Sequence, residues 1–413
     1  MTLNCTDRAY NVPADGAPTL STRCPCSDLC PCRTSRWYRI AAHNNAIGPG
    51  INCYVPELLA AERRKGAIFG YCTPNDDRDP TGYSTRCAIA RLEQVELQNV
   101  RITGSVLECV GALPAILNRG SIVKLTTDFR GYARGATGSV KLIEIPVDVT
   151  SAIDPGFVAH FVKNAPAPIV FLTFPVTNPG QQLVSLDIVE SVLRANSDAI
   201  VVLDNAYRGS LETEKLARYA LTNSRTLYLN TASKDLLLCG ARFGWAIATM
   251  PLIDWISAAL PPYGVGADAL GYGLDILSRP HALRAARATQ AQARDILNSG
   301  LRRLGAKVRS GPGPWILVQL GDDAGRIVKI LADTFLIDVQ LQTDALTGWI
   351  RISATVPCEA DRIVSAFASI LGTATTSVEH AFQAELKLQS LVRSAINAER
   401  HEEWAPLLTS NYR

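Results

Sequence analysis

The sequence predicts an α/β fold in which a mostly parallel sheet is joined to a smaller α+β unit. Short, β-rich apolar runs alternate with helix-length segments from about residue 102 onward, and several of these runs are apolar at every position. Continuously apolar strands are typical of a sheet that is covered on both faces, and regular alternation with helices is typical of parallel pairing. A compact mixture of helices and strands follows Pro280 and predicts the second unit.

Each element is expected from its own pattern. The strands of the main sheet are expected at Ser121–Leu125, Lys141–Val147, Pro168–Phe174, Ala199–Leu203, Thr226–Asn230 and Phe243–Thr249. The second unit is expected to contain a long helix Ala282–Leu304, strands Trp315–Leu320 and Trp349–Ser353 with a helix between them, and a helix Glu359–Leu371. Helical patterns also cover Val55–Lys65, Arg86–Gln98 and Val378–Ile396. Because ligands of parallel α/β sheets bind at the carboxyl ends of strands, we look for chemistry there.

Composition excludes several classes of protein. The 413 residues include 41 Lys and Arg against 38 Asp and Glu, a net charge of +3, and 47% are hydrophobic. This chain can bury a large core, and its charge balance argues against a polybasic nucleic-acid binder. No apolar run reaches about 18 residues, so no membrane span is expected. The first residues lack the pattern of a secretory signal. We expect a cytoplasmic protein with no nucleic-acid or membrane partner.

Two candidate segments carry groups that bind phosphate or polar rings. Gly104-Ser105-Val106 opens a helix, and the free N–H groups of a helix start suit a phosphate, although a plain helix cap has the same sequence. Asn178 follows an apolar strand and precedes a proline, which holds it extended and directs its amide to the strand end. An ordinary turn is the alternative for Asn178.

Two further segments carry charged groups at strand ends. Asp204 ends an apolar run and precedes Tyr207; a carboxylate there is costly unless it is paired, or unless it caps the next helix. Lys234 follows Ser233 after another strand, and Arg242 lies between small residues as a candidate phosphate ligand. A solvated lysine is the ordinary alternative for Lys234.

Together the four segments supply a phosphate-binding turn, an amide, a carboxylate, a phenol and a lysine. Pyridoxal phosphate needs such a set. A lysine forms a Schiff base with its aldehyde, a carboxylate keeps the pyridine nitrogen protonated so that the ring accepts electrons, and an amide and a phenol bond the ring oxygen. The combination favours pyridoxal 5'-phosphate as the cofactor.

The order of these motifs resembles the fold-type I pyridoxal-phosphate enzymes. Within them the chain is similar to the class I/II aminotransferases, especially the histidinol-phosphate aminotransferase branch, over about residues 38 to 372. The resemblance implies a mostly parallel, seven-stranded type of sheet in a large domain, a smaller α+β domain, and an enzyme acting on an α-amino acid.

The resemblance also implies roles for the residues quoted above. Lys234 would form the internal aldimine and later shuttle the proton. Asp204 would pair with the pyridinium nitrogen, while Asn178 and Tyr207 would bond the ring oxygen. The phosphate ligands would be Gly104, Ser105, Val106, Ser233 and Arg242.

Further implied contacts concern the ring, the substrate and a partner subunit. Phe129 would stack on the ring, with Tyr132 as its rival and as a candidate substrate contact. Arg351 would grip the substrate α-carboxylate, and Asn45 lies where the family has a substrate-binding segment. Tyr71 resembles the tyrosine that reaches the phosphate of a partner subunit, which implies a homodimer with sites at the interface.

Four departures from the family pattern occur, and the last two bear on the substrate. The usual Asp-Glu-Ala-Tyr reads Asp-Asn-Ala-Tyr at residues 204–207, and the Asn-Pro turn lacks its usual threonine. The Val-Arg that helps to bind histidinol phosphate reads Val339-Gln340, and Trp315 with its neighbours replaces an expected asparagine. These changes disfavour histidinol phosphate and favour an amino acid that is bound through Arg351.

The resemblance divides the chain into five parts. They are a Cys/Pro-rich extension (1–35), a segment that packs with the small domain (36–68), the large cofactor-binding domain (69–278), the small domain (279–372) and a helical extension (373–413). Of the 11 cysteines, four lie between Cys24 and Cys32 and could bind zinc or an iron–sulfur cluster, but the spacing lacks Cys-x-x-Cys pairs. No metal is expected, and the other cysteines are expected to be small buried residues.

Two alternatives to an aminotransferase remain open. A lyase, cyclase or β/γ-replacement enzyme resembling the capreomycidine-synthase type would use the same cofactor for a different bond, and Gln340 and the two extensions motivate it. A non-catalytic homologue that recruits a partner or metal through its Cys-rich arm is the second. Lys234, Asp204 and Arg242 argue against the non-catalytic alternative.

Overall fold

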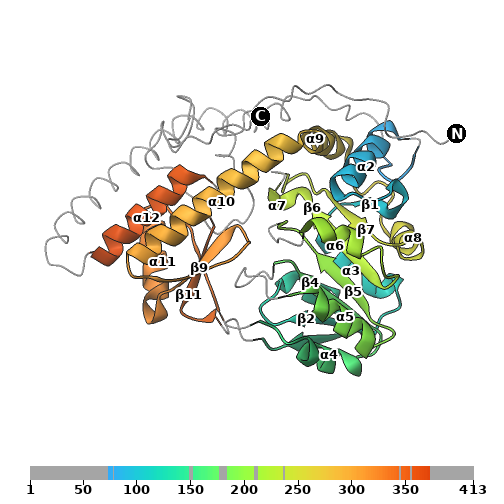
Figure 1. The fold of residues 1–413 in the computed structure, drawn as a ribbon, viewed down its shortest axis with the longest axis horizontal. Coiled ribbons are helices and arrows are strands. Elements are labelled where there is room, and N and C mark those ends of the chain that lie inside the picture. Colours follow the sequence, from blue (N-terminus) through green and yellow to red (C-terminus); the bar gives the residue numbers. More distant parts are fainter. Residues whose placement is uncertain are drawn as a thin grey trace, which may run out of the picture.

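Two sheets organise the chain in the computed structural model. It describes residues 73–77, 79–147, 152–175, 184–208, 213–235, 238–343, 346–353 and 356–372. The large sheet has seven strands in the order β1-β7-β6-β5-β4-β2-β3, and the second has four in the order β10-β11-β9-β8. The expected helices Val55–Lys65 and Val378–Ile396 and the Cys24–Cys32 cluster lie outside the described residues. Figure 1 shows the two sheets side by side.

The large sheet is parallel except at one strand. Its strands are β1 (Val100–Thr103), β2 (Ser121–Leu125), β3 (Lys141–Ile145), β4 (Pro168–Thr173), β5 (Ile200–Asp204), β6 (Thr226–Thr231) and β7 (Gly244–Ile247). The strand β7 runs antiparallel to both β1 and β6, while the remaining neighbours are parallel. All six expected strands form within a residue or two of their predicted ends. The seventh, β1, was not predicted as a separate strand, because its run is only four residues long.

Helices cover both faces of the large sheet, as its apolar strands require. One face packs on α3 (Val106–Ile116) and α8 (Met250–Ala259), and the other packs on α2, α4, α5, α6 and α9. The bounds of this second group are Pro80–Glu93, Pro155–Lys163, Leu186–Ala195, Thr213–Tyr219 and Ala267–Leu277. Alternate strand residues face opposite cores: Val201 and Leu203 face one, Ile200 and Val202 the other.

The second sheet has its own core. Its strands are β8 (Lys307–Ser310), β9 (Trp315–Gln319), β10 (Gln340–Leu341) and β11 (Trp349–Ser353), all paired antiparallel. They pack on α10 (Pro280–Arg303), α11 (Ala324–Thr334) and α12 (Pro357–Gly372). The short helices η3 (Leu97–Asn99), η4 (Arg130–Gly135), η5 (Gly321–Asp323) and α7 (Ala232–Asp235) complete the described elements. In Figure 1, α10 extends from near α9 to the second sheet.

Two smaller expectations also meet the structure. The helix expected at Arg86–Gln98 is shifted, since α2 begins at Pro80, where Asp79 caps its first N–H groups, and ends at Glu93. Among the cysteines the structure describes, Cys87 and Cys109 are buried as expected, whereas Cys239 is exposed. Within the described ranges, no helix is long and apolar enough to cross a bilayer.

Candidate active site

The candidate site lies at the carboxyl ends of β4, β5 and β6. Asp204 is the last residue of β5 and pairs in register with Thr173 of β4 on one side and Leu229 of β6 on the other. The chain leaves β6 directly into α7, which carries Lys234. Because β4, β5 and β6 are parallel neighbours, their carboxyl ends lie at the same end of the sheet. The predicted carboxylate and lysine therefore both lie at that end.

Asp204 is a buried carboxylate held by neutral groups. It is 3% exposed, its Oδ2 accepts a hydrogen bond from the Tyr132 hydroxyl at 2.6 Å, and its Oδ1 accepts one from the Ala206 N–H at 2.9 Å. No arginine or lysine of the described chain forms an ion pair with it. Burial raises the pKa of Asp204 to about 6, opposed by the Tyr132 hydrogen bond and the charge of Lys234. A buried carboxylate without a cation is suited to a cationic ligand.

Lys234 faces the ring of Tyr207. Its Nζ lies 5.6 Å from the ring centroid, which is within the range of a cation–π contact. The Tyr207 ring then meets Trp315 of β9 edge to face, with centroids 4.6 Å apart. This contact joins the large sheet to the second sheet. The structure thus brings Lys234 and Tyr207 together. Trp315, which the sequence analysis noted only because it stands where the family has an asparagine, lies beside Tyr207.

Arg351 completes this row of side chains. It lies on β11, is 7% exposed, and its guanidinium carbon is 5.4 Å from the centroid of the Trp315 ring. Its Nη2 donates to Oε1 of Gln340 on β10. Burial lowers the pKa of Arg351, and Tyr207 opposes this shift. The aromatic rings of Tyr207 and Trp315 thus lie between the amine of Lys234 and the buried guanidinium of Arg351.

Buried polar contacts with Glu93 hold the segment that carries Tyr207. Arg208 forms a buried ion pair with Glu93 of α2 at 2.5 Å, although it occupies a positive φ of 39°. The same Glu93 oxygen accepts hydrogen bonds from the Tyr228 hydroxyl at 2.9 Å and from Trp245 Nε1 at 3.0 Å. Asn205 donates to Tyr228 as well. Sequence reasoning missed Glu93, because nothing in its helix pattern marks it as buried.

The candidate phosphate ligands have partners within the chain. Ser105 is buried and its Oγ accepts the Glu108 N–H at 3.1 Å, while Glu108 Oε2 accepts the Gly104 N–H at 2.5 Å. This is the helix cap that the sequence left open as an alternative. Val106 N begins α3 beside them. A phosphate here would have to share the helix start with a carboxylate.

The other two phosphate candidates follow β6. Ser233 is buried and bonded to the Thr231 hydroxyl at 2.9 Å. Arg242 is exposed, has a φ of 53°, and donates to the Cys239 carbonyl at 3.3 Å. The candidate phosphate ligands therefore lie near strand ends, and each bonds to a partner within the chain and not to a common centre.

Phe129 and Tyr132 have different surroundings. Tyr132 is fully buried, its ring is stacked on Phe171 with centroids 4.4 Å apart, and its hydroxyl contacts Asp204 and Thr173. Phe129 is half-buried and meets Tyr132 edge to face at 5.4 Å. The geometry favours Phe129 for ring stacking and gives Tyr132 a position behind the site instead of a substrate contact. Asn45, Tyr71 and Asn178 lie outside the described residues.

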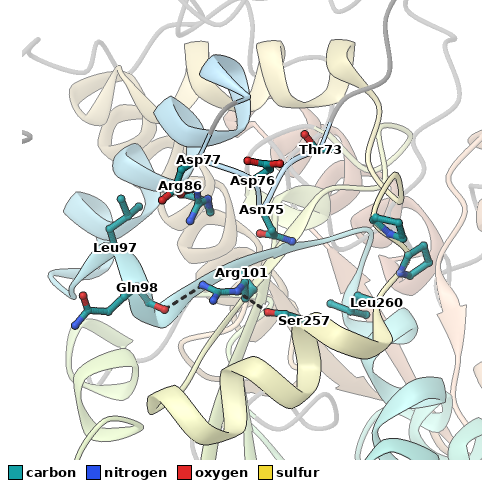
Figure 2. A pocket seen from close by; sticks show the side chains of 12 residues that line it. Thr73, Asn75, Asp76, Asp77, Arg86, Leu97, Gln98, Arg101, Ser257 and Leu260 are labelled. Atoms are coloured by element: carbon teal, nitrogen blue, oxygen red, sulfur yellow. Dashed lines mark hydrogen bonds and ion pairs between the residues drawn. The ribbon is translucent and has the colours of Figure 1, made fainter. Parts of the chain in front are cut away.

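A cavity of about 730 Å³ lies elsewhere in the fold (Figure 2). None of the predicted site residues that the structure describes lines it. Its two arginines have partners within the chain. Arg86 pairs with Asp77. Arg101 pairs with Asp254 at 3.5 Å and donates to the Ser257 hydroxyl and to the Gln98 carbonyl at 3.0 Å. Figure 2 shows Arg101 between these last two partners. The cavity adds no group to the candidate site.

Comparisons with known proteins identify a family of similar sequences. The sequence model of a family described as "Aminotransferase class I and II" matches residues 88–367. A histidinol-phosphate aminotransferase of Akkermansia muciniphila is 26% identical over 341 residues, covering 81% of this chain and 90% of that protein. One of Stenotrophomonas maltophilia is 29% identical over 236 residues, covering 55% of this chain and 65% of its own.

A solved structure has a similar fold. It is histidinol-phosphate aminotransferase from Sinorhizobium meliloti in complex with pyridoxal-5'-phosphate, with a TM-score of 0.70 and 20% identity. The similarity covers 82% of this chain and 92% of that one. At this identity the likeness concerns the fold.

Proposed function

The chain belongs to the class I and II aminotransferase family, and on this premise we propose that it transfers the amino group of an α-amino acid with Lys234 as the covalent ligand of pyridoxal phosphate. Membership in this family shows an enzyme of the aminotransferase type with the fold-type I architecture and this cofactor. It does not favour the lyase, cyclase or replacement reaction. We also propose that the enzyme is a cytoplasmic homodimer.

The described residues fit the cofactor at its ring-nitrogen end. Asp204 is buried without an ion pair, which a protonated pyridine nitrogen would supply, and Lys234 lies at the next strand end. When bound, pyridoxal phosphate provides an aldehyde that captures an amine and a protonated ring that withdraws electrons from the substrate. Asp204 is the single observation that carries the assignment, because a buried carboxyl at a strand end, in no ion pair within the described residues, is stabilised as a carboxylate by a cationic ligand that faces it.

The side chains have distinct tasks in the transfer. Lys234 Nζ would take the proton from the substrate Cα, and a positioned base of this kind contributes about 10²- to 10⁴-fold in rate. Arg351 binds the α-carboxylate in bidentate fashion and so orients the Cα–H bond. Trp315 and Tyr207 cover the space between them and exclude water from the proton transfer.

A labelling experiment tests the assignment of Lys234. Borohydride reduction of the holoenzyme followed by proteolysis should place the pyridoxyl mass on the peptide that contains Lys234. The Lys234→Ala variant should lose this label and fall in activity by about 10²- to 10⁴-fold. Lys215→Ala, at an exposed lysine of α6, is the matched control and should retain both. A label on any other lysine would refute the assignment.

We further propose that the substrate carries one carboxylate at Arg351 and no phosphate. The relatives named above act on histidinol phosphate according to their names. In this chain Gln340 faces Arg351 where a second cation would be expected, and its carbonyl oxygen occupies Nη2. A carboxylate needs only one guanidinium, whereas a phosphate dianion calls for more charge. Amino-donor screening should show turnover of an α-amino acid at least about tenfold above histidinol phosphate, and the reverse order would refute this proposal.

A homodimer is supported by surface chemistry near α8. Met250 and Trp255 of this helix and Tyr263 after it are large apolar side chains with exposed fractions of 42%, 54% and 58%. A group of exposed apolar side chains is typical of an interface. Light scattering should give twice the 44.6 kDa chain mass, and Trp255→Glu should shift the population to monomers, whereas Phe157→Glu, at another exposed ring, should not.

A further inference from the structure

Four buried side chains form a continuous row behind the candidate site. The oxygen atoms of Asp204, Tyr132, Thr173 and Asp128 follow one another at 2.6 Å in each of three successive contacts. Their exposed fractions are 3%, 0%, 1% and 2%, so water does not replace any of these partners. Asp204 and Thr173 end neighbouring strands, and Asp128 and Tyr132 follow the end of β2.

Counting hydrogen atoms shows that the row needs a proton from a carboxyl group. Three oxygen–oxygen contacts of 2.6 Å are hydrogen-bond distances, and each requires one hydrogen atom between the oxygens. The Tyr132 and Thr173 hydroxyls supply two. With both carboxyls ionised, one contact would set lone pairs against each other in a buried place, where an unmade hydrogen bond costs about 1–3 kcal/mol. One carboxyl must therefore carry the third hydrogen.

The proton can reside at either end. In one arrangement Asp204 is the acid, and each hydroxyl donates toward an ionised Asp128. In the other, Asp128 is the acid and each hydroxyl donates toward an ionised Asp204. The change moves one hydrogen across each contact, breaks and forms three O–H bonds, and transfers the negative charge between the two ends with no net uptake of protons.

The backbone around the two carboxyls favours an ionised Asp128 over an ionised Asp204. Asp128 accepts two backbone N–H groups, from Phe129 at 2.7 Å and Thr173 at 3.2 Å, whereas Asp204 accepts one. Burial raises the pKa of both carboxyls.

The charged groups around the row are few. Lys124 of β2, which pairs with Glu144 of β3, lowers the pKa of Asp128, and Lys234 of α7 lowers that of Asp204. From α3, only Cys109 interacts electrostatically with Asp204, and burial raises the pKa of that thiol to about 12, so it remains neutral. The proton's position is thus set by what faces Asp204.

We propose that Asp204, Tyr132, Thr173 and Asp128 share one proton and that a cation facing Asp204 moves it to Asp128. This makes Asp128, Thr173 and Tyr132 positioning residues that provide a full negative charge at Asp204 when the ring nitrogen is protonated. The identity of that cation rests on the proposed function; the shared proton does not. The negative charge that would balance a protonated ring nitrogen is therefore already present in the protein, at Asp128, before the cofactor binds.

Infrared spectroscopy of the cofactor-free protein tests the proton count. At slightly acid pH, below the pKa of about 6 of Asp204, the wild type should show the C=O stretch of a protonated buried carboxylic acid. Asp128→Asn and Asp204→Asn should each abolish this band, because the new amide donates the third hydrogen and the remaining carboxyl becomes an acceptor. Asp275→Asn is the matched control, since Asp275 is 3% exposed but paired with Arg279, and it should retain the band.

The infrared spectra support or refute the shared proton as follows. Absence of the band in the wild type, or its retention in either Asp128→Asn or Asp204→Asn, overturns the shared proton, so one folded variant of the two is enough for refutation. Addition of pyridoxal phosphate should shift the wild-type band without removing it, as the acid moves to Asp128. If the cofactor does not bind, the proposed function fails while the cofactor-free spectra remain readable.

A pair of isosteric variants separates the proton from simple packing. Asp128→Leu fills the same space without a hydrogen-bonding group, whereas Asp128→Asn retains a donor. Cofactor affinity should fall by about tenfold in the leucine variant, because a buried Thr173 oxygen loses its partner, and should remain near wild type in the asparagine variant. Equal losses in the two would show that a donor at this position does not restore binding, and would overturn the shared proton; no loss in either would show that shape alone matters.

Discussion

The two ends of the candidate site are built differently. At the ring-nitrogen end, Asp204 and Tyr132 are buried at strand ends and already bonded to each other. At the proposed phosphate end, the Ser105 side chain accepts the backbone N–H of Glu108, and Arg242 is exposed. The first end is preorganised, so a ligand there gains the full electrostatic interaction. The second must exchange internal partners for the ligand, and each exchange reduces the net gain.

This difference predicts that the ring-nitrogen end affects rate and the phosphate end affects affinity. The largest effect is expected from Asp204→Asn, because an amide cannot balance the charge of a protonated ring nitrogen. The turnover number should fall by about 10³-fold, the size of the loss when one preorganised electrostatic group is removed.

The control for this prediction is Asp275→Asn, at a carboxylate of similar burial outside the site. Steady-state kinetics at saturating cofactor is the measurement. A fall of less than about tenfold in Asp204→Asn would mean that this end is not where the charge of the ring is balanced.

The same buried carboxylate predicts a pH dependence of stability. Burial raises the pKa of Asp204 to about 6, above its ordinary value of 3.8. The folded state then binds a proton more tightly than the unfolded state. This contribution is full below about pH 4 and is lost as the pH rises to about 6, for a total of up to about 3 kcal/mol. Urea unfolding of the cofactor-free protein should show this slope, and Asp204→Asn should flatten it. A difference in stability between the wild type and Asp204→Asn that does not change over this range would contradict the assignment.

The third prediction concerns the phosphate end. Arg242→Gln should weaken cofactor binding by about tenfold to a hundredfold, the value of one charge-assisted hydrogen bond, and should leave the turnover number at saturating cofactor within about threefold. Equilibrium dialysis measures the affinity. Arg218→Gln, at an exposed arginine of α6, is the matched control. A large loss of turnover with unchanged affinity would reverse the division between the two ends.

The sequence predicted the position of a residue correctly where a single apolar strand determines that position. Asp204 and Lys234 follow apolar runs, and the ends of β5 and β6 lie side by side in the sheet. It failed where a role depends on a partner from a distant segment. Thr173 looks like an ordinary polar interruption of an apolar strand, and Asp128 like a turn residue, until register places them beside Tyr132. The antiparallel pairing of β7 with β1 was equally invisible, because periodicity does not encode strand direction.

The smallest expected effect comes from Glu108, whose carboxylate caps the start of α3 where a phosphate would bind. Glu108→Gln keeps a carbonyl acceptor for the Gly104 N–H but removes a negative charge from the helix start. A charge near a helix end is worth about 0.3–1 kcal/mol. The cofactor-free protein should therefore lose about that much stability, while cofactor affinity should rise by about two- to fivefold because the phosphate no longer faces a carboxylate. Asp187→Asn, in the first turn of another helix, α5, should reproduce the loss of stability without the gain in affinity. If Glu108→Gln weakens binding instead, the capped start of α3 is not a phosphate site, and the affinity of the phosphate end comes from the turn around Arg242.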